Sequence, residues 1–321
     1  MPPFLHIRKG EHMSLIEQNL FGTIDKVQTA IERLRAFEPK DRPYWLAFSG
    51  GKDSCVILEL AKMAGVNFEA HYSVTSVDPP ELVRFIKKQH PEVSIDIPHD
   101  KNGKPISMWS LLKSRATPPT RIMRYCCEKL KESSGKGTVT ITGVRWAESA
   151  NRKQNQGAIT IASKGADKIP EVQASNFVST SRGGVILNDD NDEARRAVEV
   201  CYRTRKTLIN PIIDWLDSDV WEFIHQYNVP YCDLYDKGKS RLGCIGCPVN
   251  TSTRKQELDD YPKYKEQYLR CFDVMIKNRF DRGLKTMPQW KTGQDIYDWW
   301  VDEPEKNYDQ LSLLEEYDAD S

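Results

Sequence analysis

The sequence predicts an α/β protein with a doubly wound, mostly parallel sheet, on three observations. Short apolar segments alternate with amphipathic helical segments over much of the chain. One such segment, 44–48, leads directly into Ser-Gly-Gly-Lys-Asp-Ser and then into a helix. The next, 68–74, ends in a polar, proline-containing turn, where α/β proteins place ligand contacts. An N-terminal helix and a C-terminal helical extension are expected beside this sheet.

Each element is predicted from its local pattern. Ser14 can cap a helix over 14–37, whose apolar residues recur at helical spacing. Runs rich in apolar and β-branched residues predict strands, and amphipathic runs predict helices. The strands are expected at 44–48, 68–74, 94–97, 138–142 and 207–213. The helices are expected at 55–63, 81–90, 106–113, 120–132, 217–227 and 260–280, with Asp217 or Ser218 as the cap of the fifth.

The domain organisation follows from where this alternation begins and ends. Residues 1–42 are expected to form a leader and a helix, 43–250 the α/β nucleotide-binding domain, and 251–321 a helical extension. Within the central domain, residues 155–206 are rich in Ser, Asn, Asp and Gly and predict a long insertion.

The overall composition limits the functional class only weakly. The chain has 321 residues with 46 basic and 46 acidic side chains, so its net charge favours no particular partner. No apolar run approaches the ~20 residues that span a bilayer, and residues 1–13 do not read as a signal peptide. A cytoplasmic location is therefore expected, where the eight cysteines would be thiols or metal ligands rather than disulfides.

The turn between the first strand of the sheet and its helix predicts a polyphosphate site. Adjacent glycines let backbone N–H groups approach an anion, and a helix N-terminus adds free donors and a favourable dipole. The spacing excludes a Walker loop, because Leu46 stands where that motif needs glycine, and no G-x-G-x-x-G is present. The predicted binding residues are Ser49, Gly50, Gly51, Lys52, Asp53 and Ser54, with Lys52 as a counter-charge and Asp53 as an alternative Mg²⁺ ligand.

Four cysteines in two pairs predict a metal centre. Cys244 and Cys247 form a C-x-x-C clip next to glycine and proline, whereas Cys126 and Cys127 are adjacent. Adjacent residues rarely place both sulfurs on one small ion, so a [4Fe–4S] cluster is favoured over zinc. The alternative is that Cys126 and Cys127 are helix packing and only the C-x-x-C pair binds or reacts.

Other charged residues are candidates for substrate contacts. Arg145 and Arg152 follow a strand end, where a guanidinium suits phosphate or sulfate, and Glu148 could orient them. Surface salt bridges are the alternative. Asp78 is a candidate for the ribose or adenine side, or a helix cap. Two basic groups could bind an anionic partner or be solvated surfaces. They are Arg121, Arg124, Lys129 and Lys131 around the cysteine pair, and Arg195, Arg196, Arg203, Arg205 and Lys206 in the insertion.

These motifs together resemble the phosphoadenylyl-sulfate (PAPS) reductase family of the PP-loop ATP pyrophosphatases, over roughly residues 43–250. The resemblance lies in S-G-G-K-D-S, the C-C pair, G-V-R-W-A-E-S-A-N-R at 143–152, and N-P-I-I-D-W at 210–215 through L-Y-D-K-G to G-C-I-G-C-P. It implies an adenine-nucleotide α-hydrolase-like fold. The cysteine set is similar to that of the [4Fe–4S] adenylyl-sulfate reductases and of the ATP pyrophosphatase of DNA phosphorothioation.

One departure from the family pattern bears on the reaction. The assimilatory reductases use a cysteine in an E-C-G-x-H motif, which this sequence lacks, and Cys271 lies inside a predicted helix, where a thiol is usually packing. The first hypothesis is therefore an ATP pyrophosphatase that adenylylates an acceptor for sulfur transfer, with Lys52, Asp53, Arg145 and Arg152 as catalytic residues. A reductase that produces sulfite and a non-catalytic nucleotide-and-cluster sensor are the alternatives, and a tRNA-thiolating variant stays open.

The first hypothesis implies specific cofactors and partners. They are a [4Fe–4S] cluster and ATP, or a sulfonucleotide, with Mg²⁺. The resemblance suggests DNA or another nucleic acid as the sulfur acceptor and a cysteine desulfurase as the sulfur donor. No membrane partner is expected, and a homo-oligomer stays open.

Overall fold

The structure is a computed structural model that describes residues 15–302 with several gaps. The gaps are 20–21, 133–134, 136, 163–165, 174–176, 181–183, 188–197, 199–205 and 285–288. The chain divides into two compact units. The first contains residues 1–72, 85–94 and 135–238, and the second contains 73–84, 95–134 and 239–321. None of the described helices is both long and apolar enough to cross a membrane.

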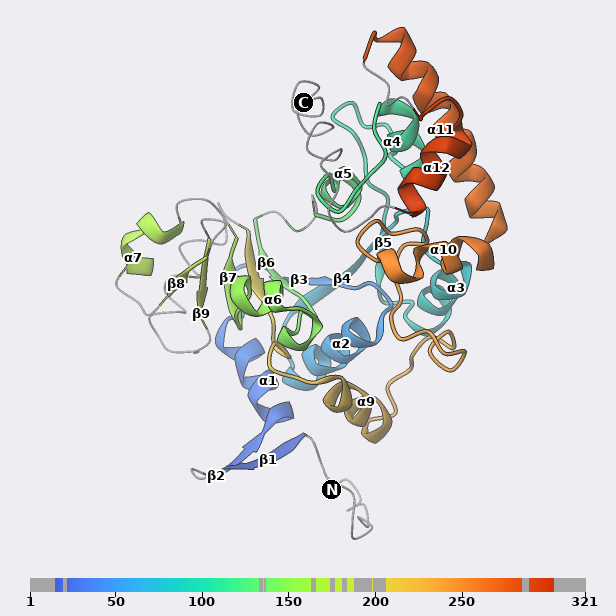
Figure 1. The fold of residues 1–321 in the computed structure, drawn as a ribbon. Coiled ribbons are helices and arrows are strands. Elements are labelled where there is room, and N and C mark those ends of the chain that lie inside the picture. Colours follow the sequence, from blue (N-terminus) through green and yellow to red (C-terminus); the bar gives the residue numbers. More distant parts are fainter. Residues whose placement is uncertain are drawn as a thin grey trace. The chain divides into compact units, whose positions relative to one another are not determined.

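The first unit contains the central sheet (Figure 1). The strands of the sheet that belong to this unit follow the order β4-β3-β6-β10-β7-β9-β8. The pairs β3–β4, β3–β6 and β6–β10 are parallel, which confirms the predicted parallel core. The strands are β3 (Tyr44–Ala47), β4 (Phe68–Ser73), β6 (Val139–Ile141), β7 (Ile159–Ile161), β8 (Val178–Ser179), β9 (Val185–Leu187) and β10 (Thr207–Ile209). Burial of all three residues of β6, β7 and β10 fits strands covered on both faces.

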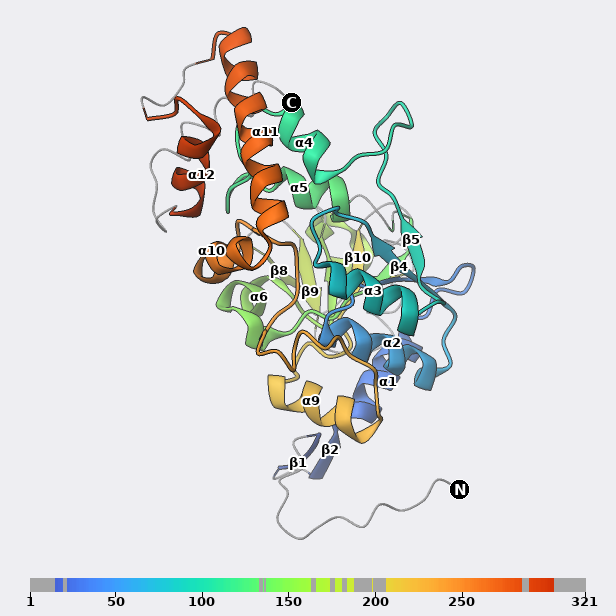
Figure 2. The same cartoon turned by 90° about the vertical axis from the view of Figure 1, so that its right-hand side faces the viewer.

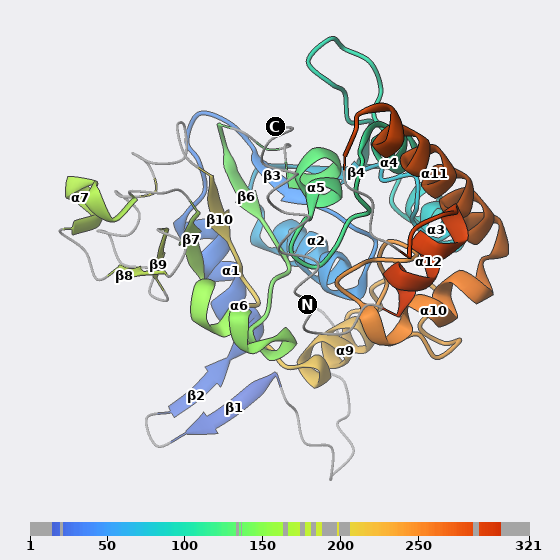
Figure 3. The same ribbon diagram turned by 45° about the horizontal axis from the view of Figure 1, so that its top comes forward.

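Helices α1, α2 and α9 belong to the same unit, and α2 packs against both of the others (Figure 3). Their bounds are α1 (Lys26–Ala36), α2 (Lys52–Ala64) and α9 (Asp217–Gln226). The unit also contains α6 (Ala150–Asn155), α7 (Pro170–Gln173) and the 3₁₀ turns η2 (Trp146–Glu148) and η3 (Ala166–Lys168). Burial of Val56, Leu60 and Ala61 in α2 shows that its apolar residues form the core of this layer.

The predicted insertion at 155–206 extends the sheet rather than leaving it. β7 pairs antiparallel with β10, β9 with β7, and β8 with β9. The strands β8 and β9 are labelled in Figure 2, and β7 lies between β9 and β10 in the sheet. Ile159, Ile161, Val185 and Leu187 are buried, and this alternation of apolar residues explains why the segment pairs with the sheet.

The predicted N-terminal helix begins later than the sequence pattern suggests. The strands β1 (Ile16–Asn19) and β2 (Gly22–Asp25) pair antiparallel, and α1 begins at Lys26. Asp25 caps α1 by accepting a hydrogen bond from the Gln28 N–H at 3.0 Å. The expected helix start at Ser14 was therefore wrong, because the favourable cap lies at Asp25. Residues 1–14 lie outside the described part of the chain.

The second unit is helical. Its longest helix, α11 (Pro262–Asp281), packs against α4 (Met108–Ser114) and α12 (Gly293–Val301), as Figure 2 shows. It also contains α10 (Thr251–Asp260) and the short α5 (Tyr125–Cys127), while α3 (Pro80–Gln89) and β5 (Ser94–Asp96) lie where the chain passes between units. Its core is aromatic, with Tyr268, Phe272 and Trp300 in ring contact.

Two predictions for this unit need correction. The helix expected over 120–132 begins only at Tyr125 and continues from Glu128 to Glu132 as the π-helix η1. The Met123 N–H donates to Thr120 Oγ1 at 3.0 Å, so a side-chain turn occupies the start of the expected helix. Within the helical extension expected at 251–321, α10 and α12 were not predicted individually, and α10 has almost no apolar periodicity.

Candidate functional site

The glycine-rich turn lies between β3 and α2, as predicted. Gly50 has φ = 75°, a conformation that favours glycine, and Gly51 is the N-cap of α2. The hydroxyl of Ser54 donates to the Gly51 carbonyl at 2.7 Å and lies 3.2 Å from the Ser49 hydroxyl. The N-cap has no side chain, so the amides at the start of α2 depend on other groups for hydrogen bonds. The turn thus provides backbone donors and two hydroxyls at a helix N-terminus.

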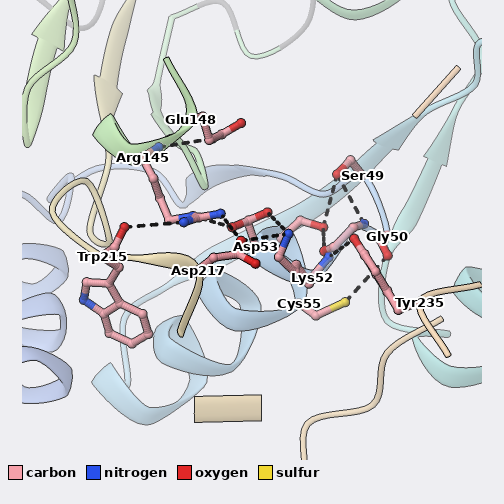
Figure 4. A network of polar contacts seen from close by, with 12 residues as sticks. Ser49, Gly50, Lys52, Asp53, Cys55, Arg145, Glu148, Trp215, Asp217 and Tyr235 are labelled. Atoms are coloured by element: carbon pink, nitrogen blue, oxygen red, sulfur yellow. Dashed lines mark hydrogen bonds and ion pairs between the residues drawn. The ribbon is translucent and has the colours of Figure 1, made fainter. Parts of the chain in front are cut away.

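A network of charges surrounds this turn (Figure 4). Arg145 Nε donates to Asp53 Oδ1 at 2.6 Å, and Arg145 Nη2 donates to Asp217 Oδ1 at 3.0 Å. Lys52 Nζ lies 3.2 Å from the same Asp217 oxygen and 3.9 Å from Asp53 Oδ2. The side chains of Lys52 and Arg145 are only 6% and 4% exposed. Two cations are therefore buried against two carboxylates at the start of α2.

The position of Arg145 is set by the turn that follows β6. A Cβ atom on Gly143 would lie 3.1 Å from the Cβ and backbone of Asp53, so glycine allows this segment to approach α2 closely. Arg145 Nη1 also donates to the Trp215 carbonyl at 3.4 Å, and the Arg145 N–H donates to Glu148 Oε1 at 3.3 Å. Glu148 also forms an ion pair with Arg152 of α6. The structure thus joins Lys52, Asp53 and Arg145 directly, and connects Glu148 and Arg152 to them.

Two side chains at this site, Asp217 and Tyr235, were not predicted to bind there. The Lys52 N–H donates to the Tyr235 hydroxyl at 2.9 Å, and Lys52 Nζ lies 5.6 Å from the centre of the Tyr235 ring. Burial raises the pKa of Tyr235, so this hydroxyl stays protonated at neutral pH. The segment L-Y-D-K-G contains Tyr235, but nothing in its sequence indicates that this tyrosine contacts the glycine-rich turn.

The prediction that Asp217 or Ser218 caps α9 was wrong. The N-cap is Leu216, whose N–H donates to Asp219 Oδ2 at 2.7 Å. Asp217 instead accepts from Lys52 and Arg145. Burial alone would raise the pKa of Asp217, but hydrogen bonds and charge from Lys52 and Arg145 lower it overall, so its carboxylate is ionised.

The four predicted metal ligands all lie in the second unit. Cys126 and Cys127 are in α5, and their side chains hydrogen-bond to each other. That hydrogen bond, burial, and the charges of Cys127, Cys244 and Cys247 raise the pKa of Cys126. The same hydrogen bond and Arg124 lower the pKa of Cys127 although burial opposes them, and Arg124 Nη2 lies 3.3 Å from its sulfur. The four thiols thus interact within one unit.

Asp78 is buried near these cysteines. Thr75 Oγ1 donates to Asp78 Oδ2 at 2.7 Å, and Cys244 Sγ lies 3.6 Å from Asp78 Oδ1. Burial, the charge of Asp78 and that of Cys247 raise the pKa of Cys244 to about 12, although Lys131 opposes them. Lys131 also hydrogen-bonds to Cys244. Asp78 belongs to the second unit, whereas the glycine-rich turn belongs to the first.

Among the described residues, no three His, Cys, Asp or Glu side chains are arranged to hold a metal ion. The donor set itself is of the right kind for an iron–sulfur cluster, with four cysteines, a cationic arginine and a lysine in one unit. The cluster therefore stays a prediction that rests on donor chemistry.

The remaining described cysteines are buried. Cys55, Cys232 and Cys271 are at most 1% exposed, and burial raises the pKa of Cys271. Cys271 lies in α11, as predicted for a packing residue. Cys201, Arg195, Arg196, Arg203 and Arg205 lie outside the described residues.

The turn between β3 and α2, at the carboxyl end of a parallel strand, defines an α/β fold of the nucleotide-binding class. The phosphoadenosine phosphosulfate reductase domain matches residues 43–250, so the chain belongs to that family. This is the range over which the motifs indicated the resemblance, and it confirms the family at that level.

Several known proteins are similar to this chain. Two uncharacterised proteins of Methanocaldococcus jannaschii are 27% and 24% identical over 76% and 77% of this chain, and 51% and 45% of their own lengths. The chain therefore spans about half the length of these relatives. An adenosine 5'-phosphosulfate reductase of Lysinibacillus sphaericus is 21% identical over 74% of this chain and 87% of its own. The crystal structure of a PAPS reductase from Candida auris has a TM-score of 0.39 and 16% identity, covering 67% of this chain and 88% of that one.

Proposed function

We propose that this chain binds an adenine nucleotide at the β3–α2 turn and is an ATP pyrophosphatase that adenylylates an acceptor for sulfur transfer. The observation that carries the proposal is the pair of buried cations, Lys52 and Arg145, that meet at the N-terminus of α2. Buried cations beside the amides of a helix N-terminus favour a ligand with several negative oxygens. Membership of the reductase family supports an adenine nucleotide as that ligand.

The proposed roles follow from the positions of the side chains. Backbone amides of Gly50, Gly51 and Lys52, with the hydroxyls of Ser49 and Ser54, hold phosphate oxygens. An oxygen of the acceptor attacks the α-phosphorus, the bond to the oxygen that bridges to the β-phosphate breaks, and pyrophosphate leaves. Lys52 and Arg145 neutralise the charge that develops on the leaving group.

Asp53 and the pair Glu148–Arg152 have supporting roles in this proposal. Asp53 holds the guanidinium of Arg145 in place and is the side chain that would contact Mg²⁺ arriving with ATP. Glu148 contacts the backbone of Arg145 and pairs with Arg152, so it orients both arginines.

The second unit would hold the sulfur chemistry. Cys126, Cys127, Cys244 and Cys247 would be the ligands of a [4Fe–4S] cluster, which when bound supplies a site for sulfur or electron relay. A persulfide from a cysteine desulfurase is the proposed source of sulfur. The terminal sulfur of the persulfide attacks the acceptor atom whose oxygen carries the AMP group, and AMP leaves with that oxygen. A second thiol then reduces the resulting disulfide between carrier and acceptor, which frees the thiolated acceptor. The resemblance to the DNA phosphorothioation enzyme favours a nucleic acid as that acceptor.

The burial of Cys271 favours this function over sulfonucleotide reduction. A reductase of the thioredoxin-dependent kind needs a thiolate that can reach the sulfate. Cys55, Cys232 and Cys271 are buried, so among the described cysteines outside the predicted cluster none is exposed to act as that nucleophile. The similarity to an adenosine 5'-phosphosulfate reductase keeps reduction as the second candidate.

One comparison of substrates tests the proposal. Anaerobically purified protein is incubated with ATP and Mg²⁺, and pyrophosphate and AMP are measured with and without DNA and a cysteine desulfurase. In parallel it is incubated with adenylyl sulfate or phosphoadenylyl sulfate and reduced thioredoxin, and sulfite is measured. The proposal expects pyrophosphate over several turnovers and no sulfite. Sulfite without pyrophosphate would establish the reductase, and nucleotide binding without either product would establish the sensor.

A further inference from the structure

Asp217 occupies the place where an anion would meet both buried cations of the site. One oxygen, Oδ1, lies 3.2 Å from Lys52 Nζ and 3.0 Å from Arg145 Nη2 (Figure 4). Asp53 contacts the same two cations with a different oxygen for each. Asp217 Oδ1 thus bridges the two cations with a single atom, as a phosphate oxygen would.

The side chain of Asp217 is much more exposed to solvent than those of the two cations that it contacts. Its side chain is 62% exposed, whereas Lys52 is 6% and Arg145 is 4% exposed. A buried cation without a counter-charge is costly, so an anion must stay beside Lys52 and Arg145. The carboxylate of Asp217, by contrast, can move into water at little cost. An incoming polyanion can therefore exchange with Asp217 and leave both cations paired.

The segment that supplies Asp217 also supplies a second oxygen to the turn. Tyr235 follows α9, and its hydroxyl accepts the hydrogen bond of the Lys52 N–H at 2.9 Å. That amide is one of the donors at the start of α2 that a phosphate would use. The same stretch of chain, 217–235, thus contacts both the side chain and the backbone N–H of Lys52.

We propose that Asp217 is an affinity-setting residue that competes with phosphate groups for Lys52 and Arg145. An internal competitor weakens every anion by the same factor. A ligand with a single phosphate or sulfate group, which binds weakly already, then no longer occupies the site. A nucleoside triphosphate, which also contacts the turn, binds tightly enough to occupy it. This inference rests on the proposed function, because it assigns a role at the same nucleotide site.

The test measures a gain of affinity, which a merely structural role would not produce. Binding of inorganic pyrophosphate to the full chain is measured by calorimetry in EDTA, for the wild type, Asp217→Asn and Asp233→Asn. Asp233 is the matched control, since it is 63% exposed, pairs with Lys237 on the surface of the same unit, and its change also removes one negative charge. We expect about fivefold tighter binding in Asp217→Asn, from the loss of exposed ion pairs, and a change below about twofold in Asp233→Asn.

Each outcome separates this inference from the proposed function. If the wild type binds pyrophosphate and Asp217→Asn binds it no more tightly, or if Asp233→Asn gains as much, Asp217 is not a competitor. If neither the wild type nor Asp217→Asn binds pyrophosphate or ATP, the nucleotide site itself is wrong. Asp217→Ser provides a second variant with the same expectation should Asp217→Asn fail to give the cooperative thermal transition of the wild type.

Discussion

The two units of the chain hold their reactive groups in different ways. In the first unit, the cations of the glycine-rich turn are paired with carboxylates at defined distances, and Asp53 and Asp217 hold them in place. In the second unit, the described contacts join single cysteines to charged neighbours: Arg124 Nη2 lies 3.3 Å from Cys127 Sγ, and Cys244 Sγ lies 3.6 Å from Asp78 Oδ1.

The two sites differ in what completes their geometry. A phosphate site is built from groups that are charged and hydrogen-bonded in the chain itself, so its geometry is complete in the polypeptide. A thiolate cluster is completed by its metal, because like-charged sulfurs repel one another until cations lie between them. Changes in the first unit should therefore alter nucleotide chemistry, and changes in the second should alter iron content.

The largest expected effect is on pyrophosphate release in Lys52→Met. Methionine keeps the buried stem but removes the charge beside the leaving group, so turnover of ATP should fall by about 100-fold or more. The matched control is Lys62→Met in the same helix, which removes a surface charge paired with Glu92 and should change turnover less than about twofold. Equal losses in both variants would contradict the assigned role of Lys52.

Loss of iron in Cys247→Ser should be the next largest effect. Serine lacks the soft sulfur that iron prefers, so iron and sulfide per chain after anaerobic purification should fall severalfold. Cys271→Ser changes a buried thiol of the same unit and should keep the wild-type iron content in the folded fraction. Pyrophosphate binding should be unchanged in both variants, and parallel loss of iron in Cys271→Ser would show that the effect is unfolding.

Gly143→Ala should slow ATP turnover by about tenfold. Its new methyl group would lie 3.1 Å from Asp53 and would push Asp53 away from Arg145. The matched change is Gly293→Ala in the second unit, where the methyl group would lie 2.7 Å from the backbone of Asp273 and of Leu269. That variant should lose about 1–3 kcal/mol of stability with ATP turnover kept below its melting temperature. If Gly143→Ala instead lowered the stability and left ATP turnover unchanged, Gly143 would act only on folding.

The smallest effect is a decline of stability of the first unit at acid pH. Burial lowers the pKa of His90, which packs against Phe48 and Phe85. Glu92 and Glu59 oppose this shift, and Lys62 adds to it. The unfolded chain therefore binds a proton more readily, so this stability is complete above pH ~6.5 and is lost as pH falls toward the lowered pKa.

The measurement is the urea midpoint of unfolding at pH 7.5 and pH 5.5. For one proton the loss is at most about 1.4 kcal/mol per pH unit. His90→Leu should show a smaller decline than the wild type, whereas His225→Gln, which changes an exposed histidine, should decline as the wild type does. An unchanged decline in His90→Leu would place the acid sensitivity elsewhere.

The glycine-rich turn, the alternation of strands and helices, and the family could be predicted from the sequence. Each depends on residues that are neighbours in the chain, such as Gly50 and Gly51 between β3 and α2. The N-terminal helix start failed because Ser14 and Asp25 are both acceptable caps, and only pairing of β1 with β2 chooses between them.

The sequence alone predicts the local features of this protein: a glycine-rich turn between a strand and a helix, paired cysteines, and arginines after a strand. Only the tertiary structure decided which distant side chains complete the turn. Asp217 and Tyr235 are more than 160 residues from Lys52 in the chain, and folding brings both to it. The physical reason is that local patterns report hydrogen bonding and burial of neighbours, whereas the partner of a buried charge is set by how separate elements pack.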